Sequence, residues 1–499
     1  MQPFSLIRDH APAVSTAEEI FSLVADAIPD AAAARAWSLD VVGEIAAANH
    51  LAGSNPDSLV VPSHAMAQRF ADMRRWPRTH AQDISSMKRI AADALAPLFP
   101  LAPAARSADG RIRVAIIVPW LSNNQNNNLL RVVASYLAGL LRHPDVEDAV
   151  VVVTNEFATG DPKRIELPAD PKPKMDARQF QAIHARVLEE FGAPTDRMHY
   201  APPPFSGGGH VRWLVEFDAN FRPNVVFVPN VEMTSSAIHG FGRNAATVYL
   251  QTSINNRPSY DFDRYLYLGR RRDIDESHPH PDRWHYHAFG YEPFGFDSGA
   301  TRADMGFEDD DFVIVSAGNR LEAEITPEIA DIVAHALGDD PRRKWLLLGA
   351  RDEARIRANM GEAAHRIGDR AVFKGYVFEV GDYLANCDAY ANPRRTGGAV
   401  SMSLAVYGNT PVISFDGNDA CNFLLDEMIC DTPAQYADRL RRLADDPGHL
   451  ADVATRQRDR FLAGHTADGS AADLVAHFRE ALAVRAAGSG RSAGHARHA

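Results

Sequence analysis

The chain has few cysteines, no long apolar run and no excess of positive charge. Only three of its 499 residues are cysteine (Cys387, Cys421 and Cys430), and none belongs to a Cys-x-x-Cys pair. We therefore expect a reducing compartment and neither a disulfide framework nor a structural zinc site. No run of about 18 apolar residues occurs, so no membrane span is expected. The net charge of −13 argues against nonspecific nucleic-acid binding, which needs clustered cations.

The N-terminal residues also lack a basic segment followed by an apolar run, so we expect no secretory signal peptide. These absences predict a cytoplasmic protein with at most peripheral membrane association. With 45% hydrophobic and 23% charged residues, the chain is long enough for two to three globular domains with full cores.

The chain divides into segments of different pattern. Residues 1–107 are alanine-rich with helical spacing, which predicts a helical N-terminal region. Short apolar runs alternate with helical segments over 108–295 and again over 296–465. Such alternation predicts an α/β fold of two Rossmann-like domains with parallel strands. An apolar stripe predicts a helix within 466–487, and the composition of 488–499 predicts a disordered tail.

The most informative stretch runs from Phe373 to Ser414. It contains a strand, a short helix at 380–385, a short buried strand, a glycine-rich turn, a helix at 399–407 and another strand. The turn reads Arg-Arg-Thr-Gly-Gly and leads directly into the second helix. A helix N-terminus after a parallel strand offers free backbone N–H groups and positive dipole, and glycines let phosphates approach. With two arginines adding charge, the turn predicts a diphosphate site.

These residues resemble the nucleotide-sugar half of GT-B fold glycosyltransferases, in the order F-x-G-Y…D-Y-L…P-R…G-G…S…L-A…G-N-T-P-V-I. Upstream, Val313 to Glu324 is similar to the first strand of the C-terminal domain of that fold and the G-R-L phosphate loop that follows it. Trp345 to Gly349 is similar to the next strand. The resemblance covers about residues 311–440. It implies two Rossmann-like domains facing across a cleft, sugar transfer from a nucleotide diphosphate sugar, and a last helix that crosses back to the first domain.

The resemblance to the glycosyltransferase group 1 pattern is incomplete. Its two glutamates, eight positions apart, are replaced by Thr396 and Leu404, and a lysine expected near Ile325 is missing. The Thr-Gly-Gly turn with Ser401 is more similar to the O-GlcNAc-transferase-like branch, where small hydroxyl residues hold the diphosphate. In that branch a lysine at the preceding strand end contacts phosphate, which makes Lys374 the candidate.

Strand-end positions and the resemblance together give four groups of candidate site residues. The diphosphate-binding candidates are Arg320, Lys374, Arg394, Arg395, Thr396, Gly397, Gly398 and Ser401. The nucleoside and ribose candidates are Gly318, Asn319, Gly375 and Tyr376. The acceptor-side candidates are Asn123, Asn124 and Asn126. The alternative is that these asparagines belong to a loop and are present only because asparagine tolerates turn geometry. The candidate catalytic bases are His210 and His239. The alternative for His210 is a residue of a simple connecting loop, and the alternative for His239 is a helix residue whose hydrogen bonds are made within the fold.

Two motifs could suggest a metal. The histidines His278, His280, His285 and His287 lie close in sequence, but two prolines interrupt them and an interdomain linker fits better. Asp261-Phe262-Asp263 is a D-x-D sequence near a strand start, where it is not expected to be a site. We therefore expect no metal and no cofactor.

The predicted activity is metal-independent transfer of a hexosyl or N-acetylhexosaminyl group to a hydroxyl or amide acceptor. The acceptor is an unknown glycan, lipid-linked molecule or protein, within polysaccharide or glycoconjugate biosynthesis. Two alternatives stay open. A GT-B nucleotide-sugar epimerase would act on its substrate without an acceptor, and a catalytically silent GT-B scaffold would fit the loss of both glutamates.

Overall fold

A computed structural model gives the fold. It describes residues 98–99, 110–118, 121, 128–154, 177–202, 209–229, 236–252, 261–268, 280–290, 292–296, 299–377, 379–395 and 397–495. These residues form two compact units. The first takes the described residues within 1–251, 256–266 and 474–499, and the second those within 252–255 and 267–473. Except for Leu98 and Phe99, the helical region expected over 1–107 lies outside the described residues.

The first sheet has seven strands in the order β3-β2-β1-β4-β5-β6-β7. Their bounds are β1 Ile112–Val118, β2 Val146–Val153, β3 Met198–Tyr200, β4 Val225–Pro229, β5 Ala246–Gln251, β6 Arg264–Tyr267 and β7 Trp284–Tyr286. The pairs among β1 to β5 are parallel. Strand β1 is an almost unbroken apolar run that is buried nearly throughout, as expected for a strand covered on both faces.

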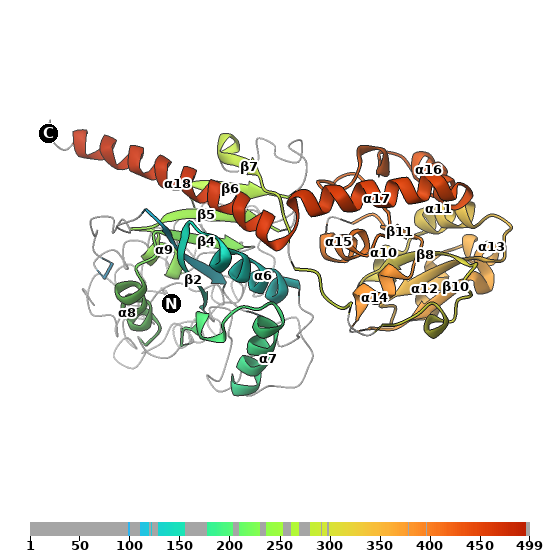
Figure 1. Ribbon diagram of the computed structural model, residues 1–499, viewed down its shortest axis with the longest axis horizontal. Coiled ribbons are helices and arrows are strands. Elements are labelled where there is room, and N and C mark those ends of the chain that lie inside the picture. The colour runs from blue at the N-terminus through green and yellow to red at the C-terminus, as the bar shows by residue number, and fades with distance from the viewer. Residues whose placement is uncertain are drawn as a thin grey trace, which may run out of the picture. The chain divides into compact units, whose positions relative to one another are not determined.

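Four helices follow strands of the first unit (Figure 1): α6 Asn128–Arg142, α7 Ala177–Glu190, α8 Gly209–Phe221 and α9 Ser236–Phe241. A fifth, α18 (Ala467–His495), returns from the far end of the chain. Its Phe478 ring is fully buried, with its centroid 5.7 Å from that of Phe227 in β4. The helix backbone continues to His495, beyond the end expected at 487, and residues 496–499 lie outside the described part.

The second sheet is parallel throughout, in the order β10-β9-β8-β11-β12-β13. Its strands are β8 Phe312–Ala317, β9 Arg343–Leu348, β10 Ala371–Lys374, β11 Ala389–Ala391, β12 Val412–Phe415 and β13 Ile429–Cys430. Its helices are α10 Leu321–Glu324, α11 Pro327–Leu337, α12 Glu353–Asn359, α13 Ala363–Ile367, α14 Val380–Ala385, α15 Ala399–Tyr407, α16 Pro433–Asp445 and α17 Pro447–Gly464. The helices expected at 380–385 and 399–407 are confirmed as α14 and α15.

Three of these helices begin with the same local device. Thr326, Thr432 and Asp446 each cap a helix N-terminus with a side-chain oxygen, and each is followed by proline. The cap satisfies a free N–H group, and proline costs nothing at a position whose N–H has no helical partner. The local sequence therefore fixes where α11, α16 and α17 start.

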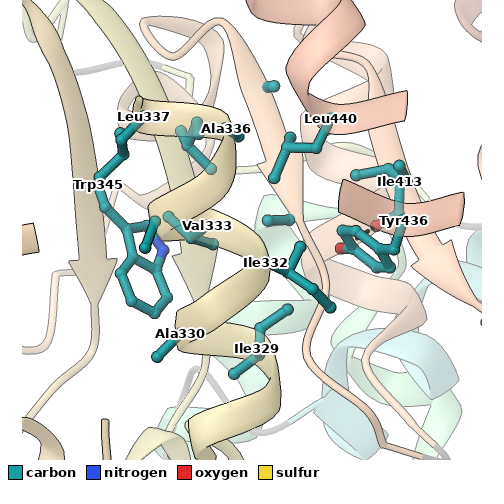
Figure 2. Close-up of a cluster of buried hydrophobic side chains, with 14 of the residues drawn as sticks. Ile329, Ala330, Ile332, Val333, Ala336, Leu337, Trp345, Ile413, Tyr436 and Leu440 are labelled. Atoms are coloured by element: carbon teal, nitrogen blue, oxygen red, sulfur yellow. Dashed lines mark hydrogen bonds between the residues drawn. The ribbon is translucent and has the colours of Figure 1, made fainter. Parts of the chain in front are cut away.

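The core of the second unit lies around α11 (Figure 2). Trp345 of β9 is fully buried beside Val333 and Leu337, and Ile332 points toward Tyr436 of α16. The indole N–H of Trp345 donates to the Ser316 hydroxyl at 3.1 Å, and Ser316 donates to the Ala391 carbonyl at 2.6 Å. These bonds tie β9, β8 and β11 together close to the carboxyl ends of β8 and β11.

His287, one of the four clustered histidines, is fully buried in the second unit. Its Nδ1 lies 2.7 Å from the Asp473 carboxylate and its Nε2 lies 3.2 Å from the Ser470 hydroxyl. Both partners belong to the first turns of α18, so this histidine anchors that helix to the end of β7.

Among the described residues, none of the helices combines the length and the apolar composition needed to cross a bilayer.

Candidate anion site at the carboxyl edge of the second sheet

The order of the second sheet reverses at β8. Strands β9 and β10 lie on one side of it, and β11, β12 and β13 lie on the other. In open parallel sheets, ligands bind at such a switch point, outside the carboxyl ends of the strands. Here those ends are Ala317 of β8 and Ala391 of β11, so Gly318 and Asn392 are the first residues beyond the strands at the switch point.

Arg395 spans these two strand ends. Its guanidinium donates to the Ala317 carbonyl at 2.9 Å, to the Asn392 side-chain oxygen at 2.7 Å and to the Tyr390 hydroxyl at 3.0 Å. Its side chain is only 6% exposed. A Cβ added at Gly318 would lie 2.7 Å from a guanidinium nitrogen, so a larger residue at 318 would have to displace the Arg395 guanidinium from these partners. Arg395 therefore directs its N–H groups at protein acceptors and braces the ends of β8 and β11.

Glu324 joins Arg395 to a second predicted residue. Its carboxylate accepts from Arg395 at 3.0 Å and lies 2.9 Å from Arg320, while its own side chain is 10% exposed. The Arg320 side chain is 62% exposed. One buried carboxylate therefore compensates two guanidinium groups, of which only Arg320 extends into solvent.

The glycine turn leads from this brace into α15. Gly398, with φ of +112°, caps the helix, and a side chain there would be strained. Gly397 has more space, because a Cβ added there would meet only an oxygen of Asp419, at 4.0 Å. The Ser401 hydroxyl lies 2.9 Å from that of Tyr390. Thr396 lies outside the described residues.

A carboxylate that the sequence did not single out lies at the same helix N-terminus. Asp419 follows β12, and its Oδ1 accepts the Ala399 backbone N–H at 3.1 Å. Burial raises the pKa of Asp419 to about 7, although the Ala399 N–H and the charge of Arg395 act in the opposite direction. The sequence feature that could have indicated Asp419 is an acidic residue in the loop after β12. That feature has meaning only once β12 is known to neighbour β11 in the sheet.

Arg394 points elsewhere. Its side chain is 55% exposed, lies 3.3 Å from the Glu328 carboxylate and stacks over the Phe415 ring at 3.8 Å from its centroid. This side chain is accessible to a ligand, whereas the neighbouring Arg395 is covered.

The expected nucleoside residues lie at the ends of β8 and β10. Asn319 is exposed in the turn after Gly318, and Gly375 and Tyr376 are exposed after β10, with Tyr376 48% accessible. Lys374 ends β10, and its ammonium lies 5.7 Å from the centroid of the Tyr383 ring. Because β10 is two strands away from β8, Lys374 is separate from the Arg395 brace.

The candidates in the first unit are less fully described. His239 lies in α9 and is 6% exposed. His210 lies in α8, but its side chain is not described, and Asn123, Asn124 and Asn126 lie outside the described residues. Asp263 accepts the backbone N–H of Thr247 at 2.8 Å, which gives this acid a structural role within the first unit.

No protein-family model matches the sequence, and no curated protein matches it. Several solved structures match the fold. Anabaena HepE in complex with UDP and glucose aligns with a TM-score of 0.51 at 12% identity, covering 74% of this chain and 100% of that chain. A mutant O-GlcNAc transferase of Thermobaculum terrenum aligns with 0.52 at 16% identity, covering 85% and 79%. A glycosyltransferase of Rickettsia africae aligns with 0.52 at 11% identity, covering 74% and 99%.

The chain has the GT-B fold. The expectation drawn from residues 311–440 is thereby confirmed at the level of the fold, as is the α/β architecture of two units. Within the GT-B fold, the reversal of strand order at β8 places Gly318, Arg395 and the glycine turn at the edge where ligands of parallel sheets bind.

Proposed function

We propose that this protein is a glycosyltransferase that uses a nucleotide diphosphate sugar, and that its second unit binds the diphosphate at the N-terminus of α15. The observation that carries the proposal is the Gly397–Gly398 turn, which lies at the end of the loop after β11 beside the switch point and opens α15. The proposal is supported by the likeness in fold to HepE, which was solved with UDP and with UDP-glucose.

Sugar transfer leaves a nucleoside diphosphate with developing negative charge. Backbone N–H groups and the dipole of α15 would stabilise that charge, and the exposed Arg320 and Arg394 would add positive charge beside it. These groups supply the compensation without a divalent ion, so we propose a metal-independent reaction. The Arg395 brace would keep the strand ends in place during the reaction.

We assign the protein to hexosyl or N-acetylhexosaminyl transfer in polysaccharide or glycoconjugate biosynthesis. The acceptor is a hydroxyl or amide on a glycan, lipid-linked molecule or protein, and His210 or His239 of the first unit would remove its proton. Incubation with a panel of nucleotide sugars and a cell lysate, followed by mass spectrometry of the products, identifies both substrates. Conversion of the nucleotide sugar without any acceptor would instead indicate an epimerase.

The Gly397→Val substitution tests the binding site directly. The backbone at 397 is not in the left-handed region and a Cβ there is only in ordinary van der Waals contact, so we expect valine to be tolerated by the fold and to fill the space that phosphate needs. We expect at least a tenfold loss of UDP affinity by calorimetry, corresponding to about 1.4 kcal/mol, with an unchanged melting temperature. Uridine should bind the variant and the native protein alike.

Gly464→Val provides the matched control, because a Cβ at Gly464 meets no atom within 4 Å and lies outside the site. This variant should bind UDP like the native protein. Equal UDP affinity in the Gly397→Val variant would show that phosphate does not approach this turn, and the proposed site would be wrong.

A further inference from the structure

We propose that the Asp419 carboxylate competes with the diphosphate of the nucleotide sugar for the N-terminus of α15, so that binding requires this carboxyl group to be protonated or displaced. The inference rests on the proposed function and adds a pH-dependent control to it.

The geometry places a carboxylate where a phosphate is expected. Asp419 Oδ1 accepts the first backbone N–H of α15 at 3.1 Å, from Ala399. Its Oδ2 lies 4.0 Å from the position that a Cβ would take on Gly397. The carboxylate therefore lies beside the glycine turn and accepts an N–H group of the first helical turn that has no carbonyl partner within the helix. These are the two features that would recognise phosphate.

Two positive charges near Asp419, those of Arg395 and Arg320, favour its ionised form, but both guanidinium groups have a closer carboxylate partner in Glu324. Arg395 donates to protein acceptors and pairs with Glu324, and Arg320 pairs with the same Glu324 carboxylate. Among the described residues, no arginine, lysine or histidine forms a salt bridge with Asp419 itself. The ionised form of this half-buried group is thus held first by the Ala399 N–H and then by the charges of Arg395 and Arg320, and desolvation still raises its pKa to about 7.

A phosphate cannot join an ionised Asp419 at this position without strong repulsion. Two negative groups a few ångströms apart in a partly buried site do not both stay ionised, so one takes up a proton or leaves. A neutral carboxyl group removes the repulsion, and its O–H can donate to a phosphate oxygen. The protonated form of Asp419 is therefore the form that fits a bound diphosphate.

The sign of the pH dependence follows. With a pKa of about 7, most Asp419 groups are protonated at pH 6, and roughly one in ten is protonated at pH 8. The apparent affinity for UDP is proportional to the fraction of protein in which Asp419 is protonated. The native protein should therefore bind UDP about tenfold more weakly at pH 8 than at pH 6. Ionisation of the terminal phosphate, whose pKa is near 6, adds ligand charge over the same range and does not by itself weaken binding.

The test compares the native protein with the Asp419→Asn and Asp416→Asn variants by titration calorimetry. UDP and inorganic pyrophosphate serve as ligands at pH 6, 7 and 8. Asparagine keeps a side-chain oxygen that can accept the Ala399 N–H and removes only the negative charge. Asp416→Asn is the matched control, because it removes one charge from the same loop.

We expect Asp419→Asn to bind both ligands about tenfold more tightly than the native protein at pH 8, to match it at pH 6 and to lose the decline with pH. Asp416→Asn should keep that decline. If the native protein binds both ligands but Asp419→Asn shows the same pH profile, or if Asp416→Asn shows the same gain, the competition is overturned and the proposed function stands. If none of the three proteins binds either ligand at pH 6, the proposed function fails and the competition fails with it.

Discussion

Arg394 and Arg395 are adjacent in the chain but have opposite surroundings. The Arg395 guanidinium is buried among the Ala317 carbonyl, Asn392 and Glu324, whereas Arg394 is exposed over Phe415. A buried charge that is hydrogen-bonded on several sides supports the fold. An exposed charge beside the turn is free to contact a ligand at little cost to stability.

Replacing each arginine with alanine should separate these roles. Arg395→Ala leaves the Glu324 carboxylate without its buried partner, so we expect a loss of about 3–5 kcal/mol in the free energy of unfolding. Arg394→Ala removes one exposed ion pair and one ring contact, so we expect about 1 kcal/mol or less. Urea denaturation measures both. A loss of stability in Arg395→Ala no larger than that in Arg394→Ala would contradict the brace.

The Asp419 carboxyl group should also affect stability, independently of any ligand. Its pKa is about 7 in the folded protein, against an ordinary value of 3.8. Because the folded state binds the proton more tightly, this group lowers stability as pH rises from about 4 to 7, after which its effect is constant. Asp419→Asn should therefore be more stable than the native protein at pH 8, by about 1–3 kcal/mol, and equal to it below pH 4. Thermal unfolding across this range checks the sign, and a larger gain in acid than at pH 8 would contradict it.

At this scale the sequence predicts the ligand-facing turn but not its surroundings. Gly397 and Gly398 could be placed because the turn, the helix and the preceding strand are contiguous. Glu324 and Asp419 could not, because each meets the turn only through the order of the strands, from 71 and 20 residues away. For the same reason the sequence analysis gave Arg395 the same ligand-binding role as the exposed Arg394, because the buried partners of Arg395 come from other strands and helices.

Among the elements, β12 shows how a strand is completed by a helix. Strand β13 is only two residues long and pairs with Ser414 and Phe415. The Gln457 side chain of α17 bonds both the N–H and the carbonyl of Val412, each at 2.8 Å. A side chain thus supplies the hydrogen bonds that a longer neighbouring strand would have made.

Gln457→Leu should therefore destabilise the second unit. The substitution leaves two buried backbone groups of β12 unsatisfied, so we expect a loss of about 2–4 kcal/mol in urea denaturation. Arg456→Ala, one residue earlier in α17, breaks only exposed ion pairs with Glu427 and Asp452 and should cost less than about 1 kcal/mol. Equal effects of the two substitutions would show that Gln457 does not support the strand.

Elements with strong local signals were predictable. Apolar runs gave β1 and β8, and α14 and α15 begin and end where glycine, proline and apolar residues indicate. The dependence of β12 on Gln457 was not predictable, because a glutamine inside a helix carries no local sign of the strand that it contacts.

At the scale of the whole molecule, α18 is the helix that both units share, because it begins in the second unit and continues in the first. Its Leu474 and Phe478 are fully buried, and Phe478 lies against Phe227 of the first sheet. Phe478→Ala should cost about 3–5 kcal/mol, and differential scanning calorimetry should assign the loss to the first unit. Val484→Ala on the same helix is the control, because Val484 is 50% exposed and should tolerate the change. A shift confined to the second unit would contradict this assignment.

Because α18 lies near the end of the chain, the first unit can be completed only after all residues of the second unit have been synthesised. The second unit is nearly continuous in sequence, and all of its residues precede Leu474. The first unit is discontinuous, because the side chain that covers Phe227 is added about 250 residues after that strand has left the ribosome. The apolar surface that Phe478 covers therefore stays exposed throughout synthesis of the second unit, and exposed apolar surface of this kind favours aggregation.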